Sequence, residues 1–97
     1  MGMRVISRRR IEEFVRKHPT AKPSLEQWYR VVKQATWKSL AEAKQVYPHA
    51  DLVGKRTVFN IAGNNFRLIA RINYRVQALY ILSILTHAEY SKEEWEK

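Results

Sequence analysis

The chain has 97 residues, no cysteine and a formal net charge of +9. This length allows a single domain over residues 1–97, and the missing thiols exclude a disulfide framework and thiolate metal sites. The longest nearly unbroken apolar run, residues 78–85, is far shorter than the roughly 18 residues of a membrane span, and no signal peptide is visible. We therefore expect a cytoplasmic protein with no membrane association.

The positive charge is unevenly distributed along the chain. Residues 1–75 carry a net charge of +11, whereas residues 76–97 carry −2. A field of this kind attracts polyanions and speeds their encounter with the protein, although it confers no sequence specificity. The charge distribution therefore favours a nucleic acid or another polyanion as the partner.

The first part of the chain has the pattern of a strand followed by helices. Residues 3–7 fit a short strand, and residues 8–18 carry apolar side chains at helical spacing, with Ser7 as the N-cap. Two prolines within residues 19–23 indicate a linker.

Two further helices are expected before the second half of the chain. Ser24 is expected to cap a helix over residues 25–34, because a glutamine follows it at capping-box spacing. Residues 39–47 form a shorter candidate helix that begins with another serine at capping-box spacing. A proline follows at position 48 and should end this helix.

The second half of the chain predicts three strands, over residues 57–61, 66–75 and 79–85. Residues 63–65, with the sequence Gly-Asn-Asn, supply turn residues between the first two strands. The polar segment from residue 87 fits either a short helix or a frayed tail. Together these elements predict an α+β fold, a small antiparallel sheet with two to three helices packed on one face.

Three arginines alternate with apolar residues along the middle predicted strand. Arg67, Arg71 and Arg75 would share one face of it, because successive side chains of a strand point to opposite faces. A regular strand over residues 66–75 would carry this row for roughly 26 Å at about 3.3 Å per residue. That spacing fits successive phosphates better than one small molecule. The alternative is an ordinary solvated strand face.

Four segments of the sequence together resemble a known family. They are MRVISRRRIEEFVRKHP, WYRVVKQATWKS, VFNIAGNNFRLIARINY and YILSILTHAEY, which follow one another from residue 3 to about residue 90. These segments are similar to motifs of HigB-type toxins, in the RelE-like superfamily of toxin–antitoxin systems. The resemblance implies a single toxin domain that acts as a ribosome-dependent mRNA endonuclease. It also implies inhibition by a HigA-type antitoxin.

Metal-free RNA cleavage of this kind needs a base, an acid and positive charge around the phosphate. Arg67 and Arg71 suit the charge-stabilising role, because guanidinium groups bind phosphate oxygens in a fixed fork. His87 is the first candidate for proton transfer, since an imidazole gives and takes a proton near neutral pH. Tyr90 would either stack a base or pass a proton. The alternative is that His87 and Tyr90, three positions apart, merely pack together on a short helix.

The expected RNA-binding residues are the basic side chains on and beside the predicted strands. They are Lys55, Arg56, Arg67, Arg71 and Arg75. No group of histidines and carboxylates has metal-ligand spacing and no glycine-rich phosphate loop is present, so we expect neither a metal nor a small-molecule cofactor.

Two positions depart from the pattern of the resembled family. Leu82 stands where an arginine is common, and Ser91 stands where an aspartate is frequent. Arg71 or Arg75 could compensate for the missing guanidinium; otherwise the departure predicts weak activity or an altered target. Two other functions therefore stay open, a non-catalytic RNA- or ribosome-binding module and a protein whose charge chiefly matches an acidic antitoxin.

Overall fold

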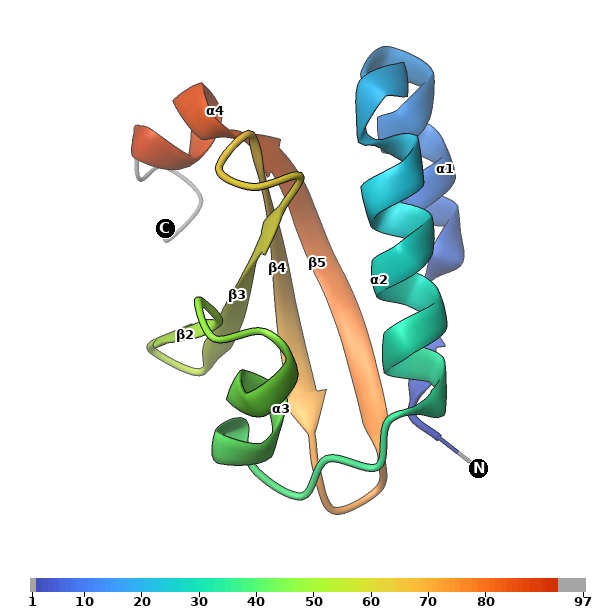
Figure 1. Ribbon diagram of the computed structural model, residues 1–97, viewed down its shortest axis with the longest axis vertical. Helices are drawn as coiled ribbons and strands as arrows, with labels where there is room; N and C mark the ends of the chain where they lie inside the picture. Colours follow the sequence, from blue (N-terminus) through green and yellow to red (C-terminus); the bar gives the residue numbers. More distant parts are fainter. Residues whose placement is uncertain (1, 93–97) are drawn as a thin grey trace.

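The computed structural model describes residues 2–92, in which five strands form one sheet in the order β1-β5-β4-β3-β2 (Figure 1). The strands are β1 (Arg4–Ile6), β2 (Asp51–Val53), β3 (Arg56–Ile61), β4 (Phe66–Asn73) and β5 (Ala78–Thr86). Neighbouring strands are antiparallel except for β1, which runs parallel to β5. The predicted α+β class is confirmed.

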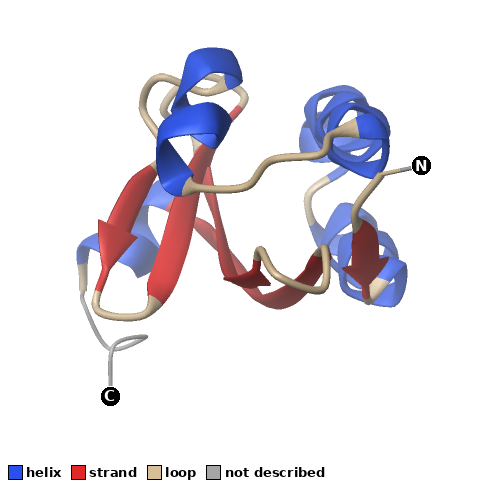
Figure 2. Cartoon of the chain, turned by 90° about the horizontal axis from the view of Figure 1, so that it is seen from below, coloured by secondary structure: helices blue, strands red, loops and turns tan. Residues whose placement is uncertain are grey.

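Within the described residues, four α-helices accompany the sheet: α1 (Arg8–Lys17), α2 (Lys22–Gln34), α3 (Leu40–Val46) and α4 (His87–Ser91). Helices α1 and α2 form an antiparallel pair beside β5, and Figure 2 shows this pair stacked on one side of the sheet. Helix α4 contacts β4 and β5 at the end of the sheet (Figure 1). No helix among residues 2–92 is long and apolar enough to cross a membrane.

The core lies between the sheet and helices α1, α2 and α3. Phe59 of β3 is fully buried at its centre, with Trp28 of α2 edge-on at 5.5 Å between ring centroids. Trp37 stacks on the same phenyl ring at 6.3 Å, and Tyr47 meets it edge-on at 5.6 Å. Because aromatic pairs add to the free energy of plain area burial, these rings hold α2 and α3 against β3.

Local capping signals place several helix ends correctly. The Ser7 hydroxyl accepts a hydrogen bond from the Arg9 amide at 3.2 Å, and α1 begins where predicted. The Ser39 hydroxyl likewise accepts from the Glu42 amide at 3.4 Å at the start of α3. These bonds satisfy amides that have no partner inside the helix, which is why both serines are read correctly from sequence.

The predicted start of α2 is wrong. The expected linker is instead a short 3₁₀ turn, Pro19–Ala21, and α2 begins at once with Lys22 and Pro23. Ser24 therefore lies inside the helix and does not cap it. Proline is tolerated in the first helical turn, because the amide that it lacks would have no intrahelical partner there.

Two strand predictions also need correction. The short strand β2 was missed, and β4 ends at Asn73, two residues earlier than predicted. The Asn73 side-chain oxygen accepts hydrogen bonds from the amides of Arg75 at 3.1 Å and Val76 at 3.3 Å. Asparagine often initiates turns in this way, so the chain reverses although the apolar alternation continues.

Candidate active site

The sheet has one face away from the core, which we call the open face. Arg67, Ile69 and Arg71 of β4 alternate with core residues of the same strand and therefore lie on the open face. Arg71 is exposed as expected, but Ile69 and Arg67 are buried. Val58 of β3, opposite Ile69, is buried beside it. The expected row of arginines on an open face therefore holds for Arg71, whereas Arg67 is covered.

Arg67 is held in place by three acceptors around the turn that precedes it. Its Nη1 donates to the carbonyl oxygens of Asn64 at 3.1 Å and Phe66 at 3.2 Å. Its Nη2 donates to the side-chain oxygen of Asn64. Only 7% of Arg67 is exposed, and its charge is compensated by these oxygens in place of water. The guanidinium is thus fixed in one orientation.

The same guanidinium contacts two side chains from α4. Its Nη2 lies 3.5 Å from His87 Nδ1, and its central carbon lies 5.2 Å from the centre of the Tyr90 ring. An arginine only donates hydrogen bonds, so this contact suits the neutral imidazole with its proton on Nε2. The structure therefore brings three predicted catalytic residues together, and we call Arg67, His87 and Tyr90 the Arg–His–Tyr cluster.

Backbone interactions fix where α4 begins, and so where His87 lies. The His87 amide donates to the Asn65 carbonyl oxygen at 2.9 Å, which ties α4 to the β3–β4 turn. Thr86 and Glu89 form a capping box, with bonds of 2.9 and 3.2 Å between each side chain and the other's amide. The imidazole is exposed and accessible to a substrate.

A second group of predicted residues meets in a cavity of about 700 Å³ on the open face. Its lining residues are Val53, Gly54, Lys55, Arg56, Arg71 and Leu82. The hairpin between β2 and β3 supplies Lys55 and Arg56, while Arg71 comes from β4. Arg67 and Arg71 are four residues apart on one strand face, so their backbones are separated by roughly 13 Å along β4.

Leu82 lines this cavity at an irregularity in β5. Ser83 lies opposite Ile69 and Ile81 opposite Ala70, so Leu82 is an extra residue at a β-bulge. The cavity keeps three cationic side chains although no arginine stands at position 82. Arg71 therefore supplies the positive charge expected to compensate for the arginine missing at position 82. Arg75 does not line this cavity and supplies none.

Arg75 is separated from the other predicted RNA-binding residues. It lies in the turn between β4 and β5, and it lines a different cavity with Arg4, Lys38 and Val76. The prediction that three arginines lie along one regular strand is therefore wrong for Arg75. The reason is the turn after Asn73, which moves Arg75 off the strand.

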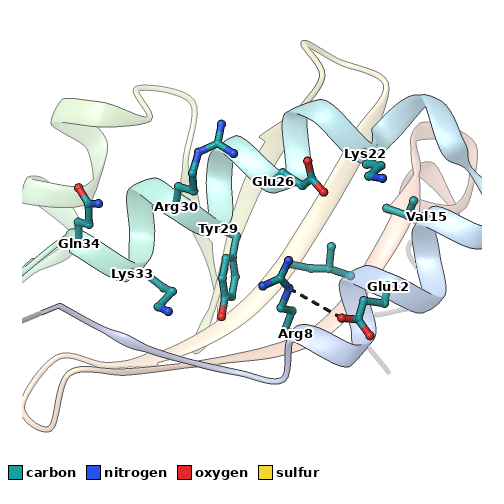
Figure 3. A pocket seen from close by; sticks show the side chains of 10 residues that line it. Arg8, Glu12, Val15, Lys22, Glu26, Tyr29, Arg30, Lys33 and Gln34 are labelled. Carbon is teal, nitrogen blue, oxygen red and sulfur yellow. Dashed lines mark ion pairs between the residues drawn. The ribbon is translucent and has the colours of Figure 1, made fainter.

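The third large cavity, of about 720 Å³, lies between α1 and α2, on the core side of the sheet (Figure 3). Tyr29 is flanked there by Arg8 at 4.8 Å and Lys33 at 5.4 Å from its ring centre. Arg8 also pairs with Glu12 at 3.8 Å. None of the predicted site residues lines this cavity.

Asn64 is predicted by the sequence only as a turn residue, but it also orients Arg67. The signal was present in the three-residue spacing between them, because asparagine side chains bond to groups close in sequence. The capping box of α4 was also readable as Thr-x-x-Glu.

Among the described residues, no group of three or more histidines and carboxylates lies close enough together to hold a metal ion.

These observations define a small basic α+β protein. A guanidinium of its sheet contacts an imidazole and a phenol from α4, and a cationic cavity lies on the open face of the same sheet. Such a combination suits chemistry on a phosphate diester.

Comparison with known proteins agrees with this class. Residues 21–93 match the family HigB_toxin, described as the RelE-like toxic component of a toxin–antitoxin system. The "mRNA interferase HigB" of Escherichia coli O6:H1 is 34% identical over 93 residues, which span 93% of this chain and 90% of that protein. The "mRNA interferase HigB" of Shigella flexneri is 29% identical over 91 residues, which span 91% and 88%. The chain belongs to the HigB toxin family, and the resemblance found in the sequence is confirmed.

Proposed function

We propose that this toxin is an endoribonuclease that cleaves mRNA on the ribosome without a metal, and that a HigA-type antitoxin inhibits it. The single observation that carries the proposal is the Arg–His–Tyr cluster, in which Arg67 contacts both His87 and Tyr90. Family membership and the names of the two relatives support the same activity.

The proposed reaction is an internal transesterification of RNA. The ribose 2′-oxygen attacks the adjacent phosphorus and loses its proton to a base, while the 5′-oxygen leaves and receives a proton from an acid. The products are a 2′,3′-cyclic phosphate and a 5′-hydroxyl. His87 is the proposed proton-transfer residue, because it is exposed and only one of its ring nitrogens faces Arg67.

The cationic groups serve the transition state and the flanking phosphates. Arg67 is preorganised by Asn64 and Phe66, so its guanidinium needs no reorientation as negative charge develops on the phosphorane. Arg71, with Lys55 and Arg56 in the neighbouring cavity, is proposed to bind adjacent phosphates. Tyr90 presents one ring face to Arg67, which supports a positioning role beside its possible stacking or proton-passing roles.

A specific observation also supports a second candidate, a non-catalytic RNA- or ribosome-binding protein. Arg67 is mostly buried and bonded within the protein, and Leu82 replaces the arginine common in the family, so fewer guanidinium groups face a substrate. Induced expression in a bacterial host separates the candidates. Growth arrest with shortened mRNAs is expected for the nuclease, whereas arrest with intact mRNAs would indicate the binder and contradict the proposal.

The metal-free and antitoxin parts of the proposal need separate tests. The rate at which the toxin cleaves mRNA on purified ribosomes should be the same with and without added chelator. The magnesium that the ribosomes need is kept constant in both reactions. Co-expression with the antitoxin should restore growth, and a stable complex should copurify. Growth arrest that no co-expressed HigA-type protein relieves would contradict the proposed partner.

A further inference from the structure

Tyr80 is an exposed aromatic residue near the start of β5. It lies directly opposite Arg71 of β4 on one side and Ile6 of β1 on the other. Since directly opposite residues share a face of the sheet, the Tyr80 ring stands beside Arg71 on the open face. The core residues of this part of β5 are Leu79 and Ile81, so Tyr80 takes no part in the core.

The surroundings of Tyr80 combine apolar surface with positive charge. Tyr80 is 39% exposed, so part of this residue is accessible to a ligand. Leu82, two residues further along β5, lines the 700 Å³ cavity together with Arg71 and Val53. A planar ring and an aliphatic wall therefore adjoin the cationic cavity. Because a nucleotide has an apolar base and an anionic phosphate, it is a ligand that matches both parts.

We propose that Tyr80 and Arg71 form a subsite for one nucleotide of single-stranded RNA. The base stacks on the Tyr80 ring, the phosphate binds Arg71, and Leu82 supplies an apolar wall. This nucleotide is distinct from the one at the Arg–His–Tyr cluster, because Arg71 lies roughly 13 Å from Arg67 along β4. Tyr80 would thus strengthen the binding of RNA without selecting one particular base. The inference rests on the proposed function, because it names a further contact with the same substrate.

A binding experiment with RNA lacking single bases tests this subsite. The parent protein carries His87→Ala, so that the RNA is not cleaved during the measurement. The affinity of this parent for ribosomes programmed with a synthetic mRNA is then measured. Base–aromatic stacking is sequence-tolerant, and its loss should weaken binding roughly 5- to 150-fold in the Tyr80→Leu variant. Tyr80→Phe keeps the ring and should bind as the parent does. Removing one base of the mRNA should weaken the parent by the same factor, yet leave the affinity of Tyr80→Leu unchanged.

Tyr29→Leu is a matched control, because Tyr29 also lies beside an arginine but on the core side of the sheet. It should bind as the parent does, and melting curves of all variants should show that they are folded. Equal affinity of parent and Tyr80→Leu for the intact mRNA would overturn the inference. So would a loss in Tyr80→Leu that no base removal reproduces, because the ring would then contact something other than a base. The proposed nuclease activity is judged separately, by cleavage with the wild-type protein.

Discussion

Asn64→Ala should reduce both stability and mRNA cleavage, because Asn64 orients the guanidinium of Arg67. The substitution removes one charge-assisted hydrogen bond and leaves the two that Arg67 makes to backbone carbonyl oxygens. Hydrogen bonds to charged groups contribute about 1.5–3 kcal/mol, and we take a smaller value, about 1–2 kcal/mol, because Asn64 is exposed. For a domain of this size, each kcal/mol lowers the melting temperature by about 4–8 °C.

The same free energy, if it is also lost from the transition state, slows cleavage about 5- to 30-fold. Asn64→Asp separates the two effects, because it keeps an acceptor for Arg67 but neutralises the guanidinium charge. We expect this variant to melt no lower than the wild type and still to cleave mRNA more slowly.

The assay is single-turnover cleavage of mRNA on programmed ribosomes, together with thermal melting of each variant. Asn65→Ala is the matched control from the same turn, because Asn65 holds His87 through its backbone carbonyl oxygen, which the substitution keeps. It should melt and cleave like the wild type. Wild-type melting and a wild-type cleavage rate in Asn64→Ala would refute the reasoning that this side chain positions Arg67.

Three further predictions address proton transfer, RNA binding and the core. His87→Ala should lower the rate of mRNA cleavage about 10²- to 10⁴-fold while melting and ribosome binding stay near wild type; a folded variant that cuts at the wild-type rate would remove His87 from the mechanism. Arg71→Ala should weaken ribosome association and flatten its dependence on salt, measured by titration at several ionic strengths, whereas the remote Arg75→Ala should change both less. An equal effect of the two would contradict the separation of Arg75 from the site. Phe59→Ala should lower the free energy of unfolding by about 3–5 kcal/mol in urea titrations, and a loss under about 1 kcal/mol would contradict the central place of this ring.

Several parts of the fold could be read from sequence because their causes are local. Ser7 and Ser39 cap helices through bonds to amides two and three residues away. The turn between β3 and β4 has positive φ at Ala62 and Gly63, and the Gly-Asn-Asn sequence predicted it. The apolar alternation of β4 also fixed which of its residues enter the core. Each of these features depends on residues within a few positions of one another.

The candidate site was only partly predictable. The family motifs supplied Arg67, His87 and Tyr90 as candidates, and α4 brings them into contact. The expected open face holds for Arg71 but not for Arg67, because burial of Arg67 depends on the turn before β4 and on a helix twenty residues later. No local pattern shows whether such distant groups will surround a charge.

The sequence by itself determined the net charge, the caps of α1 and α3, the β3–β4 turn and the family motifs of this protein. Only the tertiary structure decided that β1 pairs in parallel with β5 and that β2 extends the other edge of the sheet. It also decided that Arg75 leaves the site and that Tyr80 stands beside Arg71. The physical reason is that strand pairing and register join segments far apart in the chain, so they depend on which surfaces can be buried together.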